Sequence, residues 1–102
     1  MTDLLTFLAG WYAGWQRAGR TDLKSRFGRS AKNIAPQSAW IDLKSASRWG
    51  QLTIWESGIA ELEVNDISSV DLVFSRSVEV RSTELLAELI AVLVEQVLTD
   101  GS

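Results

Sequence analysis

Both ends of the chain carry apolar residues at the spacing of an amphipathic helix. Near the N-terminus an apolar side chain recurs every three or four positions: Leu4, Leu8, Trp11 and Trp15. Thr2 and Asp3 precede this run, and either side chain can cap a helix. The pattern predicts a first helix over about residues 3–17. Gly10 and Gly14 each cost about 1 kcal/mol relative to alanine inside a helix, so we expect them where this helix packs closely against the sheet.

The C-terminal pattern is more apolar, and its main stripe holds Leu86, Leu89, Ile90, Leu93 and Val97. The opposite side holds Glu84, Glu88 and Glu95. Ser82 or Thr83 is the expected N-cap, and Glu84 in the first turn suits the positive end of the helix dipole. Further apolar residues widen the arc: Leu85, Val92 and Val94. This helix is therefore either largely buried, or one flank of it contacts a partner.

Between these helices the apolar period changes to two, which is typical of strands. Residues 20–30 alternate and carry several positive charges, which predicts a strand with one wet face. Residues 30–37 contain the single proline and are expected to form a loop. Four further strand-length runs follow, separated by short polar turns: 40–44, 50–55, 59–64 and 70–74, the last extended or followed by Val78 and Val80. Such short connections favour antiparallel neighbours.

The predicted fold class is α+β: an antiparallel sheet of about five strands in meander order, with an N-terminal helix and a C-terminal helix packed on it. The 102 residues leave room for one hydrophobic core, so we expect residues 1–102 to form a single domain. The apolar share of 46% and the charged share of 23% are those of a globular chain that folds by itself.

Successive strand residues point to opposite faces, so each run divides into two sets. One set is wholly apolar and suits the C-terminal helix: Ile41, Leu43, Leu52, Ile54, Ala60, Leu62, Val64, Leu72 and Phe74. The other mixes tryptophans and carboxylates with polar residues: Trp40, Asp42, Lys44, Trp49, Gln51, Thr53, Trp55, Ile59, Glu61, Glu63, Asp71 and Val73. Unpaired carboxylates are costly to bury and tryptophan is enriched at binding hot spots, so the second set suits a recognition surface. The alternative is that the N-terminal helix covers this face and its tryptophans are core residues.

The partner contacts that we predict combine tryptophans and acids of this face with acids of the turns beside it: Trp40, Asp42, Trp49, Trp55, Glu56, Glu61, Glu63, Asp66 and Asp71. The charge of the chain supports this choice. Residues 1–36 carry six basic side chains and two acidic ones, whereas the remainder has a net charge of −7 within a total of −3. A region this acidic repels nucleic acid and attracts a basic partner.

Composition excludes most catalytic chemistry. The chain has no cysteine and no histidine, which removes disulfides, Ser-His and Cys-His catalysis and nearly all zinc sites. Glu61 and Glu63 could act as acid and base, or could bind Mg²⁺ or Ca²⁺ with Asp42 and Asp71, but the chain lacks a phosphate-binding glycine loop and EF-hand spacing. We therefore expect no enzyme activity, no cofactor and no metal.

The basic cluster within residues 17–32 has one nearby aromatic, Phe27, so we expect a solvated edge and no direct contact with nucleic acid. The apolar N-terminal run follows Asp3 and ends at Gln16 and Arg17, so it matches neither a secretory signal nor a membrane span. We expect a cytoplasmic protein without membrane contact, as a monomer or a weak dimer.

The central hairpins resemble a known family of small bacterial proteins. The resemblance lies in Trp40-Ile41-Asp42-Leu43, in Arg48, Gly50 and Leu52, in Trp55-Glu56-Ser57-Gly58, and in Ala60 with Leu62-Glu63-Val64. A strand ending in Asp-Leu, then a W-D/E-S-G turn, then an apolar C-terminal helix is similar to the TriTu immunity proteins, over about residues 38–98. The N-terminal helix and the basic strand match only loosely.

This resemblance implies an immunity protein, an antitoxin that binds and neutralises a cognate toxin domain. The toxin would be the C-terminal part of a large secreted effector delivered between neighbouring bacteria by contact-dependent growth inhibition, and such toxins are often basic nucleases. An acidic face with aromatic anchors suits an inhibitor that occupies a phosphate-binding active site. The alternative from another class is a small acidic secretion chaperone, which would bind an effector segment in an apolar groove and dimerise.

Overall fold

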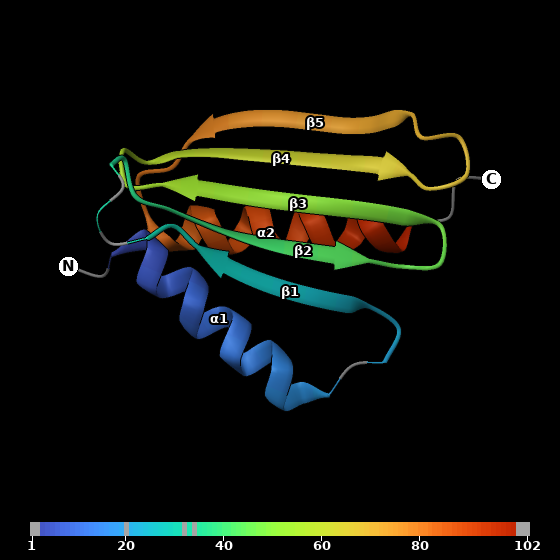
Figure 1. Cartoon of the computed structure of the whole chain (residues 1–102), viewed down its shortest axis with the longest axis horizontal. Coiled ribbons are helices and arrows are strands. Elements are labelled where there is room, and N and C mark those ends of the chain that lie inside the picture. Colours follow the sequence, from blue (N-terminus) through green and yellow to red (C-terminus); the bar gives the residue numbers. More distant parts are fainter. Residues whose placement is uncertain (1–2, 20, 32, 34, 100–102) are drawn as a thin grey trace.

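The sheet and both helices form in the predicted order. The computed structural model describes residues 3–19, 21–31, 33 and 35–99. Its elements are α1 (Leu4–Ala18), β1 (Lys24–Arg29), β2 (Ser38–Lys44), β3 (Arg48–Trp55), β4 (Ile59–Asp66), β5 (Leu72–Glu79) and α2 (Thr83–Leu98). Neighbouring strands are antiparallel and lie in the order β1-β2-β3-β4-β5 (Figure 1). The predicted α+β meander is confirmed.

Each helix begins at a side chain that caps its first turn. Asp3 Oδ1 accepts a hydrogen bond from the amide two residues on at 3.1 Å, and Ser82 Oγ accepts one from the amide three residues on at 3.1 Å. Ser82, and not Thr83, is therefore the N-cap of α2. The other candidate for α1, Thr2, lies outside the described residues. Gly19 ends α1 with a φ of 64°, a left-handed conformation that glycine adopts without strain.

Both helices pack on the same face of the sheet, which we call the inner face. On its three central strands the apolar residues are fully buried: Ala39, Ile41, Leu43, Leu52, Ile54, Ala60, Leu62 and Val64. The predicted apolar stripe of α2 is buried against them: Leu86, Leu89, Ile90, Leu93 and Val97. Leu5 and Leu8 of α1 enter the same core, and α2 packs over β2, β3 and β4. Full burial of such side chains stabilises a fold by about 1.5–3 kcal/mol each.

The α1 helix covers the inner side of β1 and β2. Tyr12 stacks on Phe27 with ring centroids 5.6 Å apart, and its hydroxyl donates to a β1 carbonyl at 3.1 Å. Phe27 is the register partner of the buried Ile41, so this contact lies on the inner face. Trp11 and Trp15 stack on one another at 5.0 Å and pack against the same core. The alternative that α1 covers the opposite, tryptophan-bearing face is therefore wrong.

The turn between β2 and β3 holds the C-terminal end of α2. Ser45 Oγ donates to the Val97 carbonyl at 2.9 Å, and Arg48 Nη1 donates to the Gln96 carbonyl at 3.0 Å. These bonds satisfy carbonyls that have no partner inside the helix. On the adjoining part of the inner face, a Cβ on Gly50 would lie 2.6 Å from Val97 Cγ2. The missing side chain at Gly50 therefore lets α2 approach β3 closely.

Gly10 and Gly14 do not lie where the helix packs against the sheet. A Cβ on Gly10 would meet no atom within 4 Å, and one on Gly14 would meet only the tip of the Arg17 side chain at 3.8 Å. The predicted close packing at these glycines is wrong, because α1 faces the core with its larger apolar residues.

The start of β5 departs from the regular alternation. Val70 lies in the preceding loop with a φ of 62°, so the strand begins only at Leu72. The pairing of β4 with β5 shifts between Val64 and Asn65. Leu72 is 56% exposed, and its predicted place in the core is wrong because this shift interrupts the alternation. Phe74, beyond the shift, pairs with Val64 and is half-buried.

Candidate functional site

The face of the sheet opposite the helices, which we call the outer face, is open to solvent. From β1 to β5 its residues are Lys24, Arg26 and Gly28; Ser38, Trp40, Asp42 and Lys44; Trp49, Gln51, Thr53 and Trp55; Ile59, Glu61, Glu63 and Asn65; and Ser75, Ser77 and Glu79. Each of them is exposed or half-buried. Figure 1 looks onto this face, with α2 behind the sheet and α1 alongside β1. Neither helix, as far as the chain is described, covers it.

The tryptophans of the outer face fall into two places. Trp40 and Trp55 are diagonal neighbours, because Trp40 pairs with Thr53, two residues from Trp55. Trp49 pairs with Lys44, four residues along β2 from Trp40, which is roughly 13 Å by strand rise. Trp49 is 42% exposed, whereas Trp40 and Trp55 are half-buried. The face thus offers an aromatic pair at one end and a single exposed indole at the other.

Trp40 also has a role in the sheet itself. Its indole lies across Gly28, the register partner on β1, so that a Cβ at Gly28 would overlap the ring. The ring therefore covers edge-strand backbone that has no side chain of its own. Any change at Trp40 affects both the candidate site and the edge of the sheet.

The carboxylates of the outer face differ in how they are held. Asp42 is half-buried, and its Oδ1 accepts a hydrogen bond from Gln51 Nε2 at 2.8 Å. Glu61 and Glu63 lie two residues apart on β4, about 7 Å by strand rise, and both are exposed. Neither forms an ion pair within the described part of the chain. We call these two residues the acidic strip.

The remaining predicted contact residues lie at the two ends of the sheet. Glu56 lies in the turn between β3 and β4. Asp66 and Asp71 bound the loop between β4 and β5, at the opposite end of β4. Six of the nine predicted residues thus share the outer face: Trp40, Asp42, Trp49, Trp55, Glu61 and Glu63.

Asp66 closes its own loop. Its Oδ1 accepts hydrogen bonds from the Ser68 hydroxyl at 2.7 Å, the Ser68 amide at 2.9 Å and the Ser69 amide at 3.2 Å. These bonds, the Ser68 hydroxyl above all, lower the pKa of Asp66 because they stabilise the charged carboxylate. The side chain is therefore engaged within the loop.

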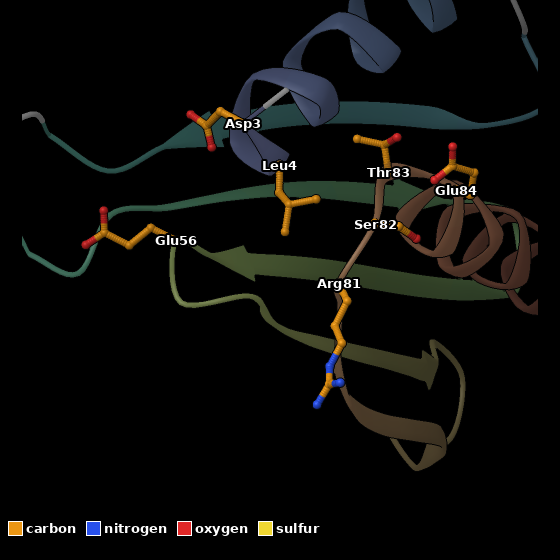
Figure 2. Close-up of a pocket in the computed structure, with 7 residues that line it drawn as sticks. All are labelled: Asp3, Leu4, Glu56, Arg81, Ser82, Thr83 and Glu84. Carbon is orange, nitrogen blue, oxygen red and sulfur yellow. The ribbon is translucent and has the colours of Figure 1, made fainter. Parts of the chain in front are cut away.

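A hollow of about 400 Å³ lies at the Glu56 end of the sheet, between the starts of the two helices. Figure 2 shows the carboxylates of Asp3, Glu56 and Glu84 around Leu4, with Arg81 turned away from them. Helix capping accounts for two of these acids, since Asp3 caps α1 and Glu84 lies in the first turn of α2. Within the described ranges, no group of three or more His, Cys, Asp or Glu side chains could hold a metal ion.

The acidic region of the sequence does not map onto one face. The acids of α2 are exposed on a helix that packs on the inner face, and so lie off the outer face: Glu84, Glu88 and Glu95. Conversely, the pairing of β1 with β2 brings Lys24 and Arg26 onto the outer face beside Lys44. With Asp42 and Trp49, these cations line a second hollow of about 330 Å³. The sequence predicts a basic edge, and only the strand pairing joins that edge to the tryptophan-bearing face.

Comparison with known families identifies the chain. The family model of the immunity protein TriTu matches residues 7–96, which reaches beyond the central hairpins to include most of α1 and all of β1. A search of curated proteins finds no match to this chain. Neither helix of the described structure has the length and apolar content needed to cross a membrane. The chain belongs to the TriTu family of immunity proteins.

Proposed function

We propose that this immunity protein binds a cognate toxin domain with the outer face of its sheet and neutralises the toxin by occupying the surface that binds the toxin's substrate. Membership of an immunity family supports the toxin as partner. The observation that carries the choice of surface is the open outer face, where tryptophans and free carboxylates stand on rigid strands that neither described helix covers. Exposed apolar patches with a polar rim are typical of protein interfaces.

The aromatic end of the face supplies the anchors. Trp40 and Trp55 are diagonal neighbours, and Ile59, which is 38% exposed, lies just beyond the turn that follows Trp55. Large side chains of this kind dominate binding energies, and truncation of one to alanine typically costs about 2 kcal/mol or more. These residues lie on strands whose inner face is fully packed, so little conformational entropy is lost when a partner docks.

The acidic strip supports a nuclease as the toxin. A nuclease holds phosphates with basic side chains, and Glu61 and Glu63 offer two exposed carboxylates to such groups. We further propose that this toxin is delivered by contact-dependent growth inhibition and acts in the cytoplasm, where the immunity protein meets it. In this mechanism the immunity protein excludes nucleic acid from the toxin and performs no catalysis itself.

Protection of growing cells tests the proposal. The candidate toxin domain is taken from the open reading frame next to this chain's gene and expressed from an inducible promoter, with and without this chain. We expect growth to be restored by co-expression, the two proteins to co-purify, and the purified chain to abolish cleavage of tRNA or DNA by the toxin. Growth arrest despite co-expression, with no complex on purification, would refute the proposal. A stable homodimer that binds an unfolded effector segment instead would favour the secretion chaperone.

A matched pair of tryptophan variants tests the surface. Trp55→Ala removes an indole from the outer face, and we expect binding to an inactive toxin variant to weaken about thirtyfold, measured by calorimetry. Trp11→Ala removes a half-buried indole from α1 and should leave the affinity within about twofold. Equal losses in both variants would mean that the toxin docks elsewhere or that both act through stability, which thermal unfolding of each variant separates.

A further inference from the structure

One corner of the outer face is positively charged, which the net charge of the chain conceals. Lys24 and Arg26 on β1 and Lys44 on β2 line a hollow of about 330 Å³, whose other walls include Asp42 and Trp49. We call the three cations the basic corner. All three are exposed, and Lys24 and Lys44 are direct register partners.

Folding accounts for only part of this corner, because Arg26 lies opposite Asp42 but Lys24 lies opposite Lys44. Like charges directly opposite one another in an antiparallel pair are destabilising, so the pairing of Lys24 with Lys44 disfavours the sheet. None of the three cations forms an ion pair with the rest of the described chain. The Asp42 carboxylate in the hollow already accepts a hydrogen bond from Gln51. The corner therefore holds free positive charge beside an indole that is 42% exposed.

The basic corner and the acidic strip lie on the same face but apart. The acidic strip is on β4, three strand spacings from β1, which is about 14 Å. In the register row that joins Arg26 to Glu63, Asp42 and Gln51 lie between them. The outer face is therefore bipolar, by which we mean that it is positive at β1 and negative at β4. An entirely basic partner would be attracted at β4 and repelled at β1, so the face favours a partner that carries both charges.

We infer that the toxin domain carries the reverse order of charge: Asp or Glu side chains that enter the hollow at the basic corner, and Lys or Arg side chains that meet the acidic strip. The inference rests on the proposed function and adds the polarity and orientation of its partner. Of the two ways to lay a bipolar surface across the strands, only one brings opposite charges together. A nucleic acid strand is a poorer occupant, because a polyanion that leaves the hollow across the sheet meets Asp42, Glu61 and Glu63.

A double charge reversal at the basic corner tests the inference by whether association with the toxin becomes slower or faster. The variant Lys24→Glu with Arg26→Glu is mixed with an inactive toxin variant in a stopped-flow instrument, at low and at physiological ionic strength. A bipolar toxin should associate about tenfold or more slowly with this variant at low ionic strength, and less so when salt screens the charges. An entirely basic toxin surface would associate faster, which would overturn the inference.

The matched control changes the charge by the same amount elsewhere. Arg17→Glu with Arg76→Glu alters exposed cations outside the outer face, since Arg76 lies opposite the buried Leu62. The association rate of this variant should stay within about twofold of the wild-type rate. Reversal of the acidic strip, Glu61→Lys with Glu63→Lys, should slow association as the basic-corner variant does. If circular dichroism shows that the first variant does not fold, Lys24→Gln with Arg26→Gln replaces it. This variant should slow association with the toxin by a smaller factor, and faster association would overturn the inference.

Two further measurements exclude other occupants of the hollow. The chain alone is titrated with a labelled single-stranded oligonucleotide, and its mass is followed by sedimentation at low ionic strength. We expect neither oligonucleotide binding nor a dimer that forms through the basic corner. If the wild-type chain does bind the oligonucleotide or dimerise, and Lys24→Glu with Arg26→Glu abolishes this, the inference is overturned. If the wild-type chain does not bind the toxin at all, the proposed function fails. If it does and the variant binds as fast or faster, only the inference fails.

Discussion

The two faces of the five-stranded sheet are built from alternate residues of the same strands, yet they meet different requirements. On the inner face, positions such as Ile41, Leu52 and Leu62 are completely buried under the helices. One residue further along, the outer face carries charges of both signs and indoles in partial contact with water. The inner face is constrained by what this chain must pack against itself. The outer face is free to match a partner, because its side chains can change without disturbing the core.

Adjacent residues on β4 should show the largest contrast between the faces. Leu62→Ala removes a fully buried side chain and should lower the free energy of unfolding by about 3 kcal/mol, because a cavity forms under α2. Glu61→Ala, one residue away on the outer face, should change it by less than about 0.5 kcal/mol. Urea denaturation of the two variants measures the difference. Similar losses would mean that the outer face is not dispensable for folding.

The two strand glycines sharpen the same comparison. Gly50→Ala should lower the free energy of unfolding by about 2 kcal/mol, because the new methyl group would lie 2.6 Å from Val97 Cγ2 and 2.8 Å from Leu93 Cδ1 inside a packed core. Gly28→Ala meets the Trp40 indole on the open face, where the ring can turn toward solvent, so we expect a loss of about 1 kcal/mol or less. A red shift of tryptophan fluorescence in the Gly28 variant would report that movement. A greater loss at Gly28 than at Gly50 would contradict this account.

The buried positions of the central strands and of α2 follow directly from the periodicity of apolar residues in the sequence. The alternation from Ile41 to Val64 separates the two faces correctly, because tight hairpins keep the strands in register. The stripe from Leu86 to Val97 predicts the buried side of α2 for the same reason. Leu72 escapes the prediction because the register shift beside Val64 depends on how the loop closes, which no local period records.

The sequence predicts the tryptophans and carboxylates of the candidate site, but it does not predict the positive charge at one corner of the same face. Trp55 and Glu61 are assigned to the outer face from alternation alone. The basic corner required two facts that the sequence does not provide: that β1 pairs with β2, and that Lys24 lies opposite Lys44 in that pairing. The sequence also does not determine which face of the sheet α1 covers, since the tryptophans of α1 could pack on either face.

The contrast between a packed and an open side extends to α1. Gly10 lies on the solvent side of the helix, where a Cβ would meet no atom within 4 Å. Gly10→Ala should therefore raise the free energy of unfolding by about 1 kcal/mol, because alanine loses less backbone entropy in a helix. Gly19→Ala at the left-handed end of the same helix should lower it by about 1 kcal/mol, since its φ of 64° suits glycine. Thermal unfolding measures both, and destabilisation by Gly10→Ala would show that this side of α1 is packed after all.

Asp66 ends β4 opposite Arg48, and acid unfolding separates a role in closing the loop from a role in contacting the partner. Its pKa in the folded chain is lowered below the reference value of 3.8, first by the Ser68 hydroxyl and then by the Ser69 amide. The folded state therefore binds this proton less readily than the unfolded state, so Asp66 stabilises the fold above the unfolded pKa and loses that effect as the pH falls through the folded pKa.

Asp66→Asn keeps an oxygen that can accept the loop hydrogen bonds and removes the charge. The wild-type chain should be more stable than this variant by a constant amount at neutral pH, and the gap should close as the pH falls below about 4. Urea denaturation of both chains across this range measures the gap, and their other carboxylates titrate alike and cancel. Because the carboxylate is engaged within its own loop, the variant should bind the toxin within about twofold of the wild-type affinity. A gap that does not change with pH, together with a large loss of toxin binding, would instead make Asp66 a contact residue that extends the outer face around the end of the sheet.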